Sequence, residues 1–186
     1  SEVSPRDGLQ NEAAQVPTHG KLRLVDALVS AGLKRIEVSS FVSPKWIPQL
    51  ADAENLIKLA GPPVGGHFTA LCPNRQGLER AASCGIGEVA VFLSVSETHN
   101  KKNVNKTVAE SLAGFRDVVQ PALEKGMRVR AYLSTLWGCP YEGDVDPRRG
   151  VEITRQLLDM GCYEVSLSDT IGAGTALQTK RILQMF

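Results

Sequence analysis

Short apolar runs rich in β-branched residues alternate with amphipathic stretches along the whole chain. The β-type pattern covers the opening EVS and residues 35–41, 66–72, 88–96, 128–135 and 163–170. Helical spacing of apolar positions follows at residues 21–33, 74–85, 108–126, 146–161 and 175–186. Such an alternation is typical of an α/β fold with a parallel sheet, and here it predicts about six βα units.

Glycine stands directly after four of the predicted helices, at Gly32, Gly85, Gly126 and Gly161. This is the position at which a left-handed residue commonly ends a helix, and glycine adopts that conformation without a steric penalty. The placement explains these glycines structurally, and we assign them no functional role.

An open doubly wound sheet and a (β/α)8 TIM barrel both fit this alternation. A doubly wound dinucleotide-binding sheet usually carries GxGxxG after its first strand, which is absent here, and GAGT follows only the sixth strand. Almost every predicted strand instead ends in polar residues, as expected at the mouth of a barrel. A complete barrel has eight units in typically ~250 residues. We therefore expect residues 1–186 to be a single, incomplete TIM-barrel catalytic domain covering about the first six units.

Composition and net charge argue against several classes of binding partner for this chain. The chain is 42% hydrophobic and 22% charged, with a formal net charge of +1. A near-neutral charge argues against a nucleic-acid or membrane surface as the main partner, and no apolar stretch is long enough to cross a bilayer. The four cysteines form no CxxC pair, so we expect reduced thiols, as in a cytosol-like compartment.

Arg6 and Asp7 lie side by side at the end of the first predicted strand. Neighbours in a strand point to opposite faces, so one of them could be a solvent-facing charge. Where the chain bends at a strand end, both could reach one pocket. There Asp7 would suit a hard divalent cation, and Arg6 would suit a developing anion.

Two further carboxylates occupy predicted strands. Glu37 stands in an apolar run, and a buried carboxylate is costly unless it is paired, so it needs a partner such as Arg6. Asp169 follows the sixth strand, where it either belongs to a site or caps the next turn.

Three connecting segments have mainly structural interpretations. CPYEG at residues 139–143 reads as a turn in which Tyr141 and Glu142 pack or cap. In SPKW, Trp46 is expected to pack against the barrel. In KKNVN, Lys101 and Lys102 either hold phosphates of a nucleotide-bearing substrate or are simply solvated, and we favour solvation.

SPRDGLQNE, IEVSSFVSPKWIPQLAD, KKNVN, GCPYEG and GCYEVSLSDTIGAGT stand in this order over essentially the whole chain. Together these motifs closely resemble the hydroxymethylglutaryl-CoA lyase family of the DRE-TIM metallolyase superfamily. The resemblance implies a metal-dependent carbon–carbon lyase on a TIM barrel. It would cleave 3-hydroxy-3-methylglutaryl-CoA to acetyl-CoA and acetoacetate, a step of leucine degradation and ketone-body chemistry.

The resemblance also implies roles for individual residues. Asp7 would be a ligand of a divalent cation, Mg²⁺ or Mn²⁺, and Arg6 would bind the thioester end of the substrate and act in catalysis. Glu37 and Asp169 would belong to the catalytic carboxylate set. The substrate pocket would also be lined by Gln10, Ser40, Asn103, Tyr132, Ser166 and Thr170. The family's remaining metal ligands, an HxH pair and an asparagine, and its catalytic cysteine are expected beyond Phe186.

Two alternatives to the lyase stay open. One is a condensing synthase or aldolase of the same superfamily, which shares the RDG-Q motif. The other is an inactive, truncated fragment that cannot complete the metal site. For the lyase we expect a small-molecule acyl-CoA as the partner, with a homodimer possible. The expected location is the bacterial cytoplasm or, in a eukaryote, the mitochondrial matrix.

Overall fold

The computed structural model describes residues 1–186 and contains one five-stranded sheet. Its strands follow the order of the sequence, from β1 to β5, and the neighbours β1–β2, β2–β3 and β4–β5 pair in parallel. The strands are β1 (Arg35–Ser40), β2 (His67–Leu71), β3 (Glu88–Ser94), β4 (Arg128–Ser134) and β5 (Glu164–Leu167). A doubly wound sheet reverses its strand order at a switch point, whereas a barrel does not. The order therefore confirms the barrel type of α/β fold.

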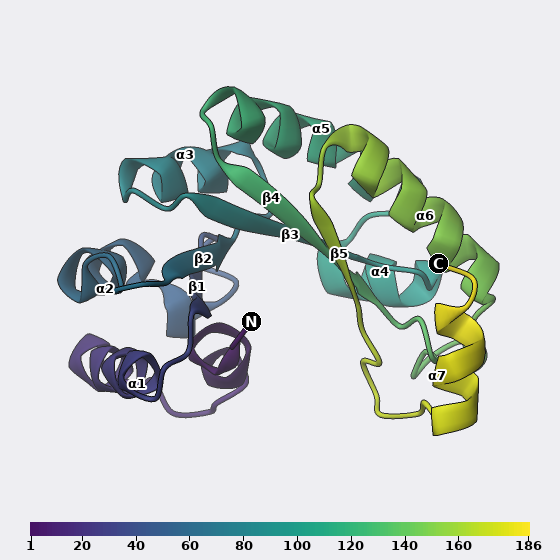
Figure 1. Ribbon diagram of the computed structural model, residues 1–186, viewed down its shortest axis with the longest axis horizontal. Helices are drawn as coiled ribbons and strands as arrows, with labels where there is room; N and C mark the ends of the chain where they lie inside the picture. The colour runs from purple at the N-terminus through teal and green to yellow at the C-terminus, as the bar shows by residue number, and fades with distance from the viewer. The chain divides into compact units, whose positions relative to one another are not determined.

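Helices separate the strands along the chain (Figure 1). They are α1 (Thr18–Ser30), α2 (Ala53–Ala60), α3 (Arg75–Ser83), α4 (Glu97–Val104), α5 (Val108–Glu124), α6 (Pro147–Met160) and α7 (Ala176–Leu183). The sequence did not predict α2 or α4, which have eight residues each. α4 has almost no apolar face to bury, so polar contacts stabilise it instead. The Ser96 side chain caps its first turn, and Asn100 accepts a hydrogen bond from the backbone N–H of Ser94 at 3.0 Å.

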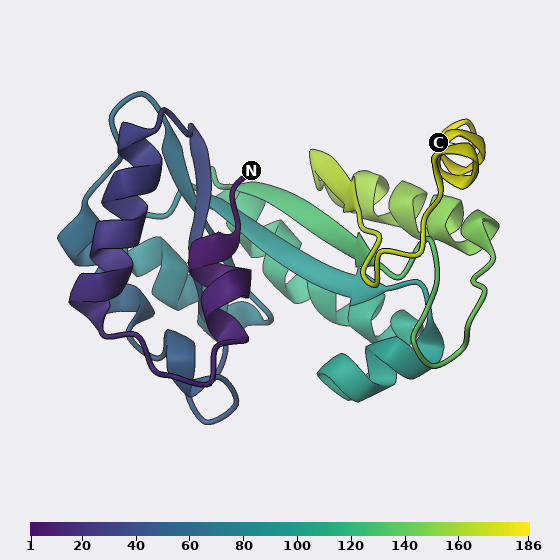
Figure 2. The ribbon, with the colours of Figure 1, turned by 90° about the horizontal axis from the view of Figure 1, so that it is seen from below.

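The opening segment is not a strand, which corrects the prediction that Arg6 and Asp7 end one. Only an isolated bridge from Glu2 to Ile36 joins it to β1, and residues Ser4–Gly8 form a helical turn. Pro5 has no N–H to continue a ladder, and the N–H groups of Arg6 and Asp7 both donate back to the carbonyl of Val3. Figure 2 shows this turn and α1 on either side of β1. The described part of the barrel therefore has five strands rather than six.

The chain divides into two compact units, residues 1–90 with 124–128, and residues 91–123 with 129–186. In the first unit, α1 and α2 pack against each other and against β1, which buries Val25, Val38 and Leu56. In the second unit, Leu133 and Leu157 are fully buried, from β4 and α6. None of the helices is both long enough and apolar enough to cross a membrane.

The prediction for the helix-terminating glycines is confirmed. Gly32, Gly85, Gly126 and Gly161 all have positive φ angles. Gly161 is the most constrained, because its φ is 111° and an added Cβ would lie 2.6 Å from Cδ1 of Leu123. Its role is steric, as the sequence indicated.

Candidate active site

Arg6 joins two carboxylates in the first unit. Its Nε donates to Oε1 of Glu37 at 2.5 Å, and its Nη1 donates to Oδ1 of Asp7 at 2.7 Å. The Glu37 side chain is fully buried, the Arg6 side chain is 12% exposed and the Asp7 side chain is 54% exposed. The expectation that a buried Glu37 needs Arg6 as its partner is confirmed. The pair keeps a buried charge compensated, which a carboxylate at this depth requires.

A helical turn rather than a strand brings Arg6 and Asp7 to Glu37 of β1. The helical turn Ser4–Gly8 places Arg6 toward β1, and Asn11 Nδ2 donates to the carbonyl oxygen of Asp7 at 2.8 Å. Arg6 thus points inward and Asp7 faces solvent, yet the two form an ion pair. The sequence left open whether one of the two side chains faces solvent or both reach one pocket. The structure combines these alternatives, because Asp7 is exposed and still pairs with Arg6. The exposed Asp7 carboxylate is accessible to a ligand.

Other predicted residues of this unit differ in their surroundings. Ser40 is fully buried at the end of β1, where its Oγ accepts from the N–H of Val42 at 3.3 Å and donates to the carbonyl of Leu71 at 3.4 Å. Gln10 is half-buried, four residues after Arg6. Cys72 lies near Glu37, and burial, together with that negative charge, raises the pKa of its thiol well above the usual range. Cys72 is therefore a neutral thiol at physiological pH and not a nucleophile.

In the second unit, Tyr132 belongs to a contact that the sequence did not predict. Arg130, which is 5% exposed, donates from Nη1 to the Tyr132 hydroxyl at 2.9 Å and from Nη2 to Oε1 of Glu164 at 2.6 Å. Its guanidinium also lies 4.7 Å from the centre of the Tyr132 ring. Residues 128, 130, 132 and 134 alternate along β4, so the period of two could have placed Arg130 on the face of Tyr132. Ser166 of β5 pairs directly with Tyr132.

Asp169 is exposed, and both of its carboxylate oxygens hold the loop that follows it. Oδ1 accepts from the N–H of Ala173 at 3.0 Å, and Oδ2 accepts from the N–H of Gly174 at 2.8 Å. Asp169 therefore caps the turn that follows it, which was one of its two expected roles. Its catalytic role stays a prediction. Its neighbour Thr170 accepts through Oγ1 a hydrogen bond from the N–H of Thr135 at 2.7 Å.

The CPYEG turn and α4 contact each other within the second unit. Glu142 accepts from the N–H of Thr98 at 2.6 Å, and this hydrogen bond lowers the pKa of its carboxyl group. Lys102 is exposed, as predicted, and its Nζ lies 3.9 Å from the centre of the Tyr141 ring. Asn103 is exposed on α4. Of the two roles expected for Tyr141 and Glu142, packing or capping, Glu142 shows capping, through the N–H of Thr98 in the first turn of α4.

Two smaller features complete this region. His99 Nδ1 lies 2.7 Å from Oγ of Ser94, and burial lowers the pKa of the imidazole. Cys139 is buried and its thiol donates to Oγ of Ser96 at 3.0 Å, so it is a packed residue. The prediction for Trp46 is wrong, because its side chain is 81% exposed and does not pack against the barrel.

No three side chains of His, Cys, Asp or Glu approach one another closely enough to hold a metal ion. Asp7 is an accessible oxygen donor, but a hard divalent cation takes six or more oxygen ligands, several of them from water or substrate. The residues of this chain therefore do not fit a complete divalent-cation site by themselves.

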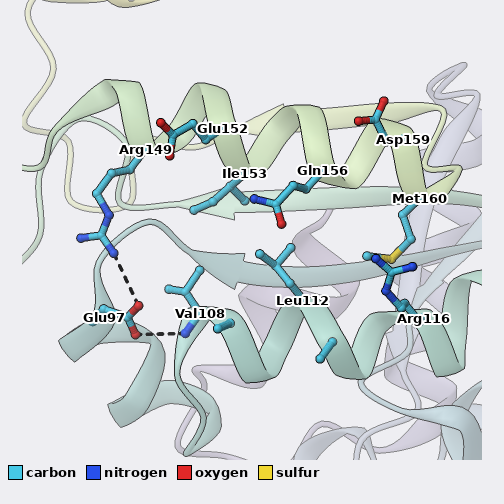
Figure 3. A pocket seen from close by; sticks show the side chains of 12 residues that line it. Glu97, Val108, Leu112, Arg116, Arg149, Glu152, Ile153, Gln156, Asp159 and Met160 are labelled. Atoms are coloured by element: carbon cyan, nitrogen blue, oxygen red, sulfur yellow. Dashed lines mark hydrogen bonds and ion pairs between the residues drawn. The ribbon is translucent and has the colours of Figure 1, made fainter.

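A groove of about 570 Å³ lies between α5 and α6 in the second unit (Figure 3). Leu112 and Ile153 supply apolar walls, and an ion pair between Arg149 and Glu97, at 3.4 Å, lies at its end. None of the predicted site residues lines this groove. It separates two outer helices and adds nothing to the candidate site.

Comparisons with known proteins agree with this architecture. The HMGL-like family model matches residues 1–186. A *Pseudomonas aeruginosa* protein named 3-hydroxy-3-isohexenylglutaryl-CoA/hydroxy-methylglutaryl-CoA lyase is 49% identical over 183 residues, which cover 98% of this chain and 61% of that protein.

Two solved structures are similarly close. The HMG-CoA lyase of *Bacillus subtilis* has a TM-score of 0.96 and 45% identity, over 99% of this chain and 62% of that one. An HMG-CoA lyase from Acinetobacter baumannii, in complex with coenzyme A and 3-methylmalate, has a TM-score of 0.93 and 38% identity. The match covers 98% of this chain and 59% of that one. The chain thus spans about three fifths of the length of these relatives. This chain belongs to the HMGL-like family.

Proposed function

We propose that the protein containing this chain is a carbon–carbon lyase that cleaves 3-hydroxy-3-methylglutaryl-CoA to acetyl-CoA and acetoacetate. The single observation that carries the proposal is the Arg6 side chain, which is held by the buried Glu37 and also contacts the exposed Asp7. Membership of the HMGL-like family and the names of the similar proteins support the choice of substrate.

Cleavage of the bond next to a tertiary alcohol is a retro-Claisen step. It needs a base for the hydroxyl proton and a donor for the oxygen of the thioester enolate that leaves. Arg6 suits the second task, because its guanidinium stays protonated and has several N–H donors. Glu37 accepts a hydrogen bond from Nε of that guanidinium, which fixes the orientation of the Arg6 side chain.

Asp7 is proposed as one oxygen ligand of a divalent cation, Mg²⁺ or Mn²⁺. A bound cation would act as a Lewis acid on the substrate oxygens. Because the residues of this chain do not complete such a site, we assign no step of the reaction to the cation. The support for Asp7 is its exposed carboxylate beside Arg6.

The other proposed residues come from each of the two units. Asp169 is proposed as a catalytic carboxylate, and its two hydrogen bonds to the following loop hold its carboxylate in a defined place. Substrate contacts are proposed for Gln10 and Ser40 in the first unit and for Asn103, Tyr132, Ser166 and Thr170 in the second.

The test is acetoacetate formation from 3-hydroxy-3-methylglutaryl-CoA by the intact protein, with Mg²⁺ or Mn²⁺ added. We expect turnover that a chelator abolishes. Turnover of a different acyl-CoA or 2-oxo acid instead would assign the protein to a condensing enzyme of the superfamily. The screen includes longer 3-alkyl branches, because the *Pseudomonas aeruginosa* relative is named for two acyl-CoA substrates.

The acyl-CoA is the partner that this proposal requires, and the complex of the *Acinetobacter baumannii* enzyme with coenzyme A supports it. A homodimer stays a prediction that sedimentation of the intact protein would check. The cytoplasmic or mitochondrial location is likewise a prediction.

A further inference from the structure

A buried lysine stands near the start of α1. Lys21 is 3% exposed, which is rare for lysine, and its Nζ donates to Oδ1 of Asp52 and to the carbonyl oxygen of Gln49, both at 2.5 Å. Oδ2 of Asp52 accepts from Oγ1 of Thr18 at 2.6 Å. Two residues of α1 thus bind both carboxylate oxygens of Asp52. The buried ammonium is paired, as a charge at this depth must be.

Gln49 extends this contact toward the candidate site. It lies in the short 3₁₀ turn Pro48–Leu50 that follows β1, and its Nε2 donates to the carbonyl oxygen of Glu12 at 3.2 Å. Glu12 ends the RDGLQNE segment, and its own N–H donates to the carbonyl of Leu9 at 3.3 Å. A continuous series of hydrogen bonds therefore runs from Lys21 through Gln49 to the turns that carry Arg6.

A hollow lies beside this series of hydrogen bonds. A hollow of about 370 Å³ lies between residues 15–18 and residues 48–52, with Lys21 in its wall, and residues 11–15 are exposed. Broad apolar packing therefore does not hold the RDGLQNE segment at this end. A buried ion pair seldom adds stability over an apolar pair of similar volume.

We infer that Lys21 is a positioning residue of the active site proposed above, acting through Gln49 on the segment that carries Arg6 and Asp7. This inference rests on the proposed function, because its consequence is a slower reaction. Misplacement of a catalytic donor by about 1 Å can cost roughly a hundredfold in rate. The ion pair of Arg6 with Glu37 holds one end of the segment, and the contact of Gln49 with Glu12 holds the other.

Gln49→Leu in the intact protein tests the inference, because it removes the side-chain amide and leaves the Lys21–Asp52 pair in place. Gln15→Leu is the matched control, since Gln15 is exposed and lines the same hollow. We expect Gln49→Leu to lower kcat about tenfold or more with a small change in KM. We also expect faster hydrogen–deuterium exchange in residues 4–12 and a nearly unchanged Tm. Gln15→Leu should change none of these.

Lys21→Met should shift kcat and exchange in the same direction, and Lys21→Arg should recover part of the loss because it keeps a cationic donor. If Lys21→Met does not fold, Lys21→Arg and Gln49→Leu decide together, and wild-type kcat and exchange in Lys21→Arg with wild-type values in Gln49→Leu overturn the inference. Unchanged exchange in Gln49→Leu overturns the inference, and so does faster exchange with kcat within about twofold of the wild type. If the wild type does not cleave the substrate, the proposed function fails separately, while the exchange measurement still tests the contact.

Discussion

Arg6 and Glu37, 31 positions apart in the sequence, form an ion pair in which Nε of the arginine lies 2.5 Å from Oε1 of the glutamate. Glu37 comes from a buried strand and Arg6 from a helical turn, and the residues before that turn reach the strand through an isolated bridge from Glu2 to Ile36. The contact therefore fixes the position of the RDGLQNE segment and compensates a fully buried charge at the same time.

Arg6→Met should both destabilise the protein and inactivate it. The substitution leaves the Glu37 carboxylate buried without this partner, which typically costs about 3–5 kcal/mol. Loss of the donor should lower kcat about a hundredfold or more. Urea unfolding and the acetoacetate assay measure the two effects. The matched control is Arg80→Met, which breaks the more exposed pair with Glu54 and should cost about 1 kcal/mol or less.

Asp7→Asn should weaken divalent-cation binding and leave the fold intact. The Asp7 carboxylate is 54% exposed, so its loss should change the free energy of unfolding by less than about 0.5 kcal/mol. We expect the affinity of the intact protein for Mn²⁺, measured by electron paramagnetic resonance titration, to fall at least tenfold. Wild-type affinity in the variant would remove Asp7 from the ligand set.

Asp169→Asn and Asp169→Ala separate the catalytic role of Asp169 from its role in the loop. The asparagine keeps an oxygen acceptor for the loop N–H groups of Ala173 or Gly174, whereas the alanine keeps none. If Asp169 acts in proton transfer, Asp169→Asn should lower kcat about a hundredfold or more while Tm stays near the wild-type value. Full activity in both variants, with a lower Tm in Asp169→Ala only, would make it a capping residue.

His99 should make the protein less stable as the pH falls toward 5.5. Burial lowers the pKa of its imidazole below its ordinary value of 6.5, and the nearby Glu142 opposes this only in part. The unfolded chain then binds the proton first, so stability is full above about pH 6.5 and falls as the pH decreases toward the folded-state pKa. His99→Gln, which cannot titrate, should show a smaller decrease in Tm between pH 7 and pH 5.5. Equal slopes in the two proteins would contradict the lowered pKa.

The local sequence pattern was sufficient to predict those elements whose structure depends on their own residues. The five strands, the long helices and the glycines that end them follow from periodicity and turn chemistry. The opening segment was misassigned because the EVS stretch at residues 2–4 looks like a strand, while Pro5 diverts the chain immediately afterward. α4 escaped prediction because its stability comes from Ser96, Asn100 and Glu142, which lie partly outside it. Trp46 shows the opposite error, in which an apolar residue is exposed despite its hydrophobicity.

The sequence by itself determined the alternation of strands and helices, the barrel type of α/β fold, the family and the residues to consider for the site. Only the tertiary structure decided that Arg6 points toward Glu37 while Asp7 faces solvent, that Asp169 holds a loop, and that Lys21 is buried beside Asp52. The reason is physical. Periodicity reports which face of an element is buried, but a polar side chain takes its partner from segments far away in the sequence.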